Sequence, residues 1–149
     1  TVQDILEKAL INRSTFYKHY RDKYDVAEQI CARMMDGFRV CTADRFELSD
    51  EKAVEARVSG LYRKLSADRD VLLPLLQLHT ETIHLYDDMF SLLKEQCRMA
   101  GNSDYPSSMY AGIVMTSVLW CLQNGENAET RKYIPLFVQM LDEFRHRMS

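Results

Sequence analysis

Apolar side chains recur every three or four residues along almost the whole chain, a spacing that predicts helices. Thr1, with Asp4 three residues later, is placed to cap a first short helix. Asn12 suits the N-cap of a second, in which Phe16 and Tyr20 are expected to face inward. The apolar face of the first helix consists of Val2, Ile5, Leu6 and Ala9. Neither helix is long enough to be stable alone, so both must dock on neighbouring elements.

Longer helices are expected in the rest of the chain. One runs from Lys23 to about Asp44, and Ser49 is placed to cap the next. The segment Val71–His79 is apolar nearly all round, which indicates a covered position, and its helical part is expected to begin near Pro74. Further amphipathic helices are expected over 83–98, over 106–123 and from 134 onward. These patterns predict an all-α fold, with a helix-turn-helix unit over 1–30 and a helical bundle over 31–149.

Composition narrows the functional classes. The chain has only 5 Gly and 3 Pro, and it lacks a Gly-rich phosphate loop and a nucleophile elbow, so an enzyme is not expected. The four cysteines form no CxxC pair, which suggests reduced, buried thiols in a cytoplasmic protein. No apolar run approaches the roughly 20 residues of a membrane span. His79 and His84 are five residues apart, which is not the spacing of a metal pair on one helix face, so neither a metal nor a cofactor is expected.

Positive charge is concentrated near the start of the chain. Over residues 13–23 four basic side chains stand against the carboxylate of Asp22, which gives +3, so the rest of the chain sums to −6. A DNA-binding protein can confine its positive charge to one patch in this way. The set expected on the outer side of the second helix is Arg13, Ser14, Thr15, Tyr17, Lys18 and His19. Arg can bind guanine with two hydrogen bonds, Thr can contact a thymine methyl, and the other side chains can donate to phosphates.

Lys23 is the first residue expected in the third helix. A lysine there opposes the helix dipole, which is mildly unfavourable unless an anion lies at the same helix end. A DNA phosphate at this position would be bound by the dipole, the backbone N–H groups and the ammonium together. The alternative is a solvated surface lysine.

The segment over residues 1–26 resembles the DNA-binding domain of the tetracycline-repressor (TetR/AcrR) family of bacterial regulators. The residues that carry the resemblance are Thr1-Val2-x-Asp4-Ile5, Ser14-Thr15-Phe16-Tyr17, His19-Tyr20 and Lys23. The resemblance implies phosphate contacts from Thr1, Tyr17, His19 and Lys23, base or groove contacts from Arg13, Ser14 and Thr15, and Lys18 beside the backbone. Leu10 replaces the glycine that is frequent in the family's turn, so the turn is expected to close differently. The family also has a helix before this motif, which suggests that N-terminal residues are missing here.

The last two helices are too apolar for one small core to cover easily. We expect them to form a four-helix interface between two copies of the chain, although they could instead complete the core of a monomer. The residues expected in the interface are Met109, Ile113, Trp120, Ile134, Val138 and Leu141.

A small-molecule pocket is a further expectation for the middle helices. The residues expected to line it are Phe38, Tyr62, His79, Thr80, Thr82, His84, Tyr86 and Met115. The alternative is an ordinary core with histidines at the surface. Taken together, these features predict a homodimeric repressor that an effector releases from a palindromic DNA operator. One alternative is a regulator of the same fold that is controlled by a protein co-regulator instead of a small ligand. The other is a helical protein-interaction adaptor without specific DNA binding.

Overall fold

The computed structural model describes residues 1–48, 50–125, 132–133, 135–136, 138–140 and 142–143. Among these residues the secondary structure is helical, without strands, so the expected all-α fold is confirmed. Short helical stretches occur within 132–143. The longer helices are α1 (Val2–Ala9), α2 (Arg13–His19), α3 (Lys23–Thr42), α4 (Glu51–Ala67), α5 (Arg69–Gln77), α6 (Leu85–Met99) and α7 (Asp104–Asn124).

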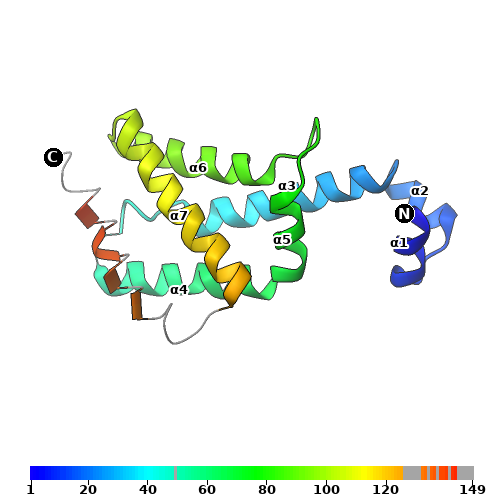
Figure 1. Cartoon of the computed structure of the whole chain (residues 1–149), viewed down its shortest axis with the longest axis horizontal. Helices are drawn as coiled ribbons and strands as arrows, with labels where there is room; N and C mark the ends of the chain where they lie inside the picture. The colour runs from blue at the N-terminus through cyan, green and yellow to red at the C-terminus, as the bar shows by residue number, and fades with distance from the viewer. Residues whose placement is uncertain (49, 126–131, 134, 137, 141, 144–149) are drawn as a thin grey trace.

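The helices are arranged around the long helix α3. Figure 1 shows α1 and α2 beyond the first turn of α3, at one end of the molecule, while α4 to α7 gather around its second half. Helix α7 crosses the bundle and contacts α6, α4 and α5. Helix α3 contacts α4, α5 and α6. A displacement of α3 relative to the bundle therefore moves α1 and α2 with it.

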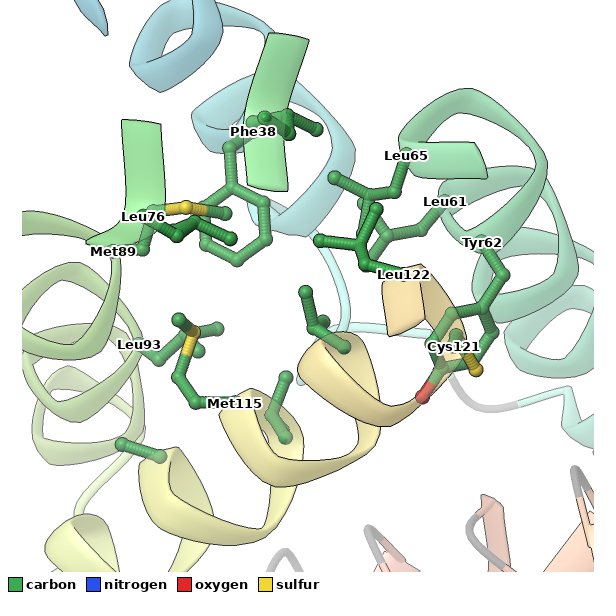
Figure 2. Packing of buried hydrophobic residues seen from close by; sticks show 14 of the residues in the cluster. Phe38, Leu61, Tyr62, Leu65, Leu76, Met89, Leu93, Met115, Cys121 and Leu122 are labelled. Atoms are coloured by element: carbon green, nitrogen blue, oxygen red, sulfur yellow. The ribbon is translucent and has the colours of Figure 1, made fainter. Parts of the chain in front are cut away.

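Buried side chains fall into two groups along α3. The larger group fills the bundle with contributions from α3 to α7, and Figure 2 shows several of these side chains pointing toward one another. Leu6 and Phe16 are buried outside this cluster, between the short N-terminal helices. The labelled core residues in Figure 2 are Phe38, Leu61, Tyr62, Leu65, Leu76, Met89, Leu93, Met115, Cys121 and Leu122. Among the described helices, none is both long and apolar enough to cross a membrane.

Most helices begin where capping residues in the sequence predict, but the expected starts of α4 and α5 are wrong. Helix α4 is capped by Asp50, whose carboxylate accepts a hydrogen bond of 3.2 Å from the Ala53 amide, so the expected cap at Ser49 is wrong. Pro74 lies inside α5 and not at its start. Its ring nitrogen cannot donate to the Asp70 carbonyl, but burial of Leu72, Leu75 and Leu76 holds this turn in place.

The turn between α1 and α2 closes through a left-handed residue. Leu10 has φ 53° and ψ 39°, and the amides of Leu10 and Ile11 both donate to the Leu6 carbonyl. The expectation that Leu10 would force a different closure is therefore wrong. Because its side chain is 92% exposed, no packing prevents the left-handed conformation, and the cost is local backbone strain.

Candidate nucleic-acid interface

Helix α2 has one buried side and one exposed side. The Asn12 side chain accepts a 2.8 Å hydrogen bond from the Thr15 amide, which confirms the expected N-cap. Phe16 is 1% exposed, and its ring centroid lies 5.4 Å from that of Tyr20 and 5.2 Å from that of Tyr17. The Phe16 side chain therefore fixes which side of α2 faces outward, and Tyr17 packs against its edge while remaining half exposed.

The outward side of α2 carries the side chains expected to contact DNA. Thr15 is partly buried, and its backbone amide donates to the Asn12 cap. Arg13 donates from Nη2 to the Gln3 side chain at 3.4 Å, a long contact that joins α2 to α1 and breaks at little cost. The exposed members of the set are Thr1, Arg13, Ser14, Tyr17, Lys18 and His19. The predicted residues of α2 thus surround the sides of the helix that Phe16 does not occupy, and all but the partly buried Thr15 are exposed.

Thr1 lies at the start of α1 and closes a capping box with Asp4. The Asp4 amide donates to the Thr1 hydroxyl at 3.2 Å, and the Thr1 hydroxyl donates to the Asp4 carboxylate at 2.8 Å. The expected cap is confirmed. Because the hydroxyl is already engaged with Asp4, a phosphate contact from Thr1 requires either a shared hydrogen bond or rearrangement of this cap.

The start of α3 differs from the expected phosphate site in one respect. The Asp22 carboxylate caps this helix and accepts hydrogen bonds from the amides of Tyr24 at 2.8 Å and Asp25 at 2.9 Å. Two of the free N–H groups of the helix end are therefore already satisfied. Lys23 remains exposed, and its ammonium lies 5.0 Å from the centroid of the Tyr24 ring. Any phosphate contact at this end must come mainly from the Lys23 side chain.

Tyr24 is a candidate contact that the sequence pattern did not single out. Its side chain is 48% exposed, and it follows Lys23 directly in the first turn of α3. A tyrosine hydroxyl beside a lysine is a suitable donor pair for phosphate oxygens. The sequence signal that could have identified it is its position directly after Lys23 in the first turn of a helix.

Arg21 contributes less free positive charge than its type suggests. Its backbone N–H donates to the Asp25 carboxylate at 2.8 Å, and its guanidinium lies 3.6 Å from Asp25 and 3.7 Å from Glu28. The backbone hydrogen bond is the main reason that the pKa of Asp25 is lowered, so this carboxylate stays charged. The unpaired cations of the surface are consequently Arg13, Lys18 and Lys23 among the described residues.

The bundle contains a cavity, but most residues expected to line a pocket lie elsewhere. The cavity measures about 350 Å³ and lies between α3, α4, α5 and α6. Of the expected residues, Phe38 lines it. Its full lining is Ile30, Arg33, Met34, Gly37, Phe38, Cys41, Leu61, Lys64, Leu65, Asp68, Val71, Leu72 and Met89.

The remaining expected pocket residues have other roles. Tyr62 is buried and shares a hydrogen bond of 2.5 Å with the Ser117 hydroxyl, which joins α4 to α7. Met115 is fully buried in the core, and Tyr86 is partly buried against it. His79 and Thr82 are exposed between α5 and α6. Helical periodicity could not place these residues in or outside a pocket, because it gives no information on which helices face each other.

The expected dimer residues are divided by the structure. Met109 and Trp120 on α7 are 43% and 38% exposed, and Ile113 between them is partly buried. Val138 is 3% exposed and packs in the core cluster of its own chain, so its assignment to an interface is wrong. Ile134 and Leu141 lie outside the described residues. The exposed surface of α7 is thus the part of the expected interface that is free in a single chain.

No family model, no curated protein and no solved structure matches this chain. The functional assignment therefore depends on the chemistry and geometry of the chain itself.

Proposed function

We propose that this protein is a sequence-specific DNA-binding regulator of transcription, which acts as a homodimer and represses its promoter. The observation that carries the proposal is the surface formed by the outward side of α2 and the start of α3, here called the recognition surface. It consists of Arg13, Ser14, Thr15, Tyr17, Lys18, His19 and Lys23. It combines three unpaired cations with hydroxyl and aromatic donors, in a chain whose net charge is −3. Apart from Tyr17, which packs against the edge of Phe16, and the partly buried Thr15, these side chains are exposed, whereas Phe16 beneath them is buried.

The geometry of α1 and α2 suits insertion into a DNA groove. Two short helices joined by a tight turn project from the end of α3, where no other described helix covers them (Figure 1). In a helix-turn-helix the second helix lies in the major groove, and residues near its N-terminus contact bases. Arg13, Ser14 and Thr15 are the N-terminal residues of α2 and are assigned to base or groove contacts. Tyr17, His19 and Lys23 follow and are assigned to phosphates.

The small number of base pairs that one recognition helix reads favours binding by two copies of the chain. One helix of seven residues reads only a few base pairs, and each good contact discriminates by about 1–3 kcal/mol. Two copies double the number of base pairs read and favour an operator with inverted symmetry. Met109, Gly112, Ile113 and Trp120 recur with helical spacing on one side of α7, where they are exposed or partly buried. We assign this side to the dimer interface, because contact with a second copy would remove its exposed large apolar side chains from water.

The cavity beside α3 is assigned to a small effector. Its walls are largely apolar, with the charged side chains Arg33, Lys64 and Asp68 among its lining. The two cations favour an apolar molecule that carries a negative charge. Helix α3 supplies six of the lining residues and also bears α1 and α2, so an effector that prefers one tilt of α3 shifts the recognition surfaces of a dimer. Control by a protein co-regulator would leave this cavity without a role.

Fluorescence anisotropy with a labelled duplex from the promoter of its own gene tests the proposal. We expect saturable binding that random duplex displaces poorly, with Kd rising steeply as salt increases. Arg13→Ala and Tyr17→Phe are expected to weaken binding, whereas Lys52→Ala, an exposed lysine at the start of α4 far from α2, is the matched control. Binding that ignores salt, or that Arg13→Ala and Tyr17→Phe leave unchanged, contradicts the assigned contacts. Equal affinity for promoter and random duplex contradicts specific recognition.

A further inference from the structure

A second cluster of side chains lies between α5 and α6, away from the recognition surface and the cavity. It consists of His79, His84 and Asp87, whose potential ligand atoms all lie within 4.8 Å of one another. The Nε2 atom of His79 lies 3.0 Å from Oδ2 of Asp87, and the two imidazole centroids are 5.4 Å apart. We propose that these three residues form a binding site for a divalent transition-metal ion of the Zn²⁺ type.

The two histidines meet because a tight turn joins them. The Thr80 amide donates to the Ile83 carbonyl at 3.1 Å, and the Thr80 hydroxyl accepts hydrogen bonds from the amides of Thr82 and Ile83. Ile83 is 1% exposed, which anchors the turn in the core. His79 and His84 directly flank this closed turn, so their imidazoles lie side by side. Their separation of five residues argued against a metal pair only on the assumption that both lie on one helix.

Asp87 reaches the pair from the first turn of α6. His84 is the N-cap residue of this helix, but its side chain makes no capping hydrogen bond, and its imidazole remains available. The backbone carbonyl of His84 accepts from the Asp88 amide at 2.9 Å, which fixes the relation between the turn and the helix. The hydrogen-bonded turn and the first turn of α6 therefore place the three ligand side chains next to one another.

The donor set is chemically selective. Imidazole nitrogens suit Zn²⁺, Cu²⁺ and Ni²⁺, whereas Ca²⁺ and Mg²⁺ prefer oxygen ligands. Two histidines and one carboxylate leave a fourth position of a tetrahedral site for water. With metal–ligand bonds of about 2.0–2.1 Å, tetrahedral geometry places ligand atoms about 3.3 Å apart. The ligand atoms of His79 and Asp87 are already close to this separation, whereas that of His84 lies within 4.8 Å of both and must approach them by side-chain rotation when a metal binds.

The alternative is an ordinary ion pair at the surface. The His79 and Asp87 side chains are 58% and 60% exposed, so their pairing contributes little to stability by itself. An ion pair needs a protonated imidazole and only two partners, whereas this arrangement brings a second imidazole beside the first. A metal ion makes use of all three groups and requires both imidazoles neutral.

The location of the site suggests what the metal does, and this step rests on the proposed function. The Thr82 hydroxyl donates to the Glu28 carboxylate on α3, and Glu28 lies 3.7 Å from Arg21, just after α2. A metal that stiffens the turn at residues 79–84 therefore also steadies the first turns of α3. We infer that the ion tightens DNA binding through α3 without contacting DNA.

Isothermal titration calorimetry of the chelator-treated full chain with Zn²⁺, in the absence of DNA, tests the site. We expect one ion per chain, with affinity reduced about tenfold or more in His79→Ala and in His84→Ala. His19→Ala, which removes a histidine from α2, is the matched control and is expected to bind Zn²⁺ with the wild-type affinity in this DNA-free titration. Asp87→Asn, at an exposed position, is a second variant that tests the carboxylate should His84→Ala fail to fold. Circular dichroism checks the fold of each variant.

Two results would overturn the metal site. One is the absence of Zn²⁺ binding by the wild-type chain. The other is unchanged Zn²⁺ affinity in His79→Ala and Asp87→Asn, which would place the ion elsewhere. Because this titration contains no DNA, its outcome is independent of the recognition surface. The coupling between the metal site and DNA binding is tested separately, by the anisotropy assay with and without Zn²⁺. An effect of Zn²⁺ on DNA affinity that disappears in His84→Ala supports the coupling. Equal DNA affinities of the wild-type chain with and without Zn²⁺ contradict it.

Discussion

The left-handed residue Leu10 offers a quantitative test of the geometry of the turn between α1 and α2. A non-glycine residue in this conformation costs roughly 1–2 kcal/mol, and glycine avoids this cost. Glycine also enlarges the conformational freedom of the unfolded chain, which offsets about 0.4–1 kcal/mol. Since the Leu10 side chain is 92% exposed, its removal loses almost no buried surface. Leu10→Gly is therefore expected to stabilise the α1–α2 unit by about 0.5–1 kcal/mol.

Leu10→Ala is the matched control for this effect. Alanine removes the same exposed side chain but keeps the steric cost of the left-handed conformation, so we expect almost no gain in stability. Amide hydrogen exchange over residues 2–20 is the suitable assay, because it measures local opening free energy. Global melting would report mainly the separate core of the bundle. Slower exchange in Leu10→Gly than in Leu10→Ala is the expected result, and equal or faster exchange would refute the geometry assigned to the turn.

The remaining predictions concern the bundle. An added Cβ meets nothing within 4 Å at Gly60 or Gly112, so either change to alanine should stabilise the single chain by about 0.5–1 kcal/mol. Analytical ultracentrifugation should show weaker dimerisation for Gly112→Ala alone, and indistinguishable dimerisation would contradict close packing at α7. Tyr62→Phe should lower the free energy of unfolding by about 1 kcal/mol in urea titrations at neutral pH, through loss of the Ser117 hydrogen bond. Burial raises the pKa of Tyr62 to about 12 from 10, so wild-type stability should fall as pH rises from 10 to 12; an equal fall in Tyr62→Phe would exclude this cause. Burial also raises the pKa of the Cys97 thiol, and mass spectrometry should find it alkylated far more slowly in the native than in the urea-unfolded chain.

Local signals in the sequence predicted the helices and most of their caps. Asn12 and Asp22 act as N-caps because a short polar side chain can reach the free amides of the next turn, whatever the rest of the fold does. The inward position of Phe16 followed from spacing alone. For the same reason, the outward residues of α2 could be predicted as one surface. These features depend on residues no more than a few positions apart.

Features that depend on the packing of distant segments were not predicted. The cavity is bounded by four helices, and periodicity does not specify which helices are neighbours. Val138 looked like an interface residue because an apolar stripe has the same pattern whether its partner is its own chain or a second copy. The cluster of His79, His84 and Asp87 arises from a turn stabilised by the Thr80 hydroxyl, which a helical spacing rule does not anticipate.

The central claim is that the recognition surface reads a DNA sequence. Selection of binding sites by the full chain from a library of random duplexes tests this claim directly, because it assumes no operator sequence. We expect enrichment of an inverted repeat with half-site centres about one helical turn apart, or a multiple of it. Arg13→Ala should change or lose the preferred bases, while Lys52→Ala should select the wild-type sequence. A selected pool without a common sequence, or an identical sequence selected by Arg13→Ala, would show that the recognition surface does not read DNA sequence.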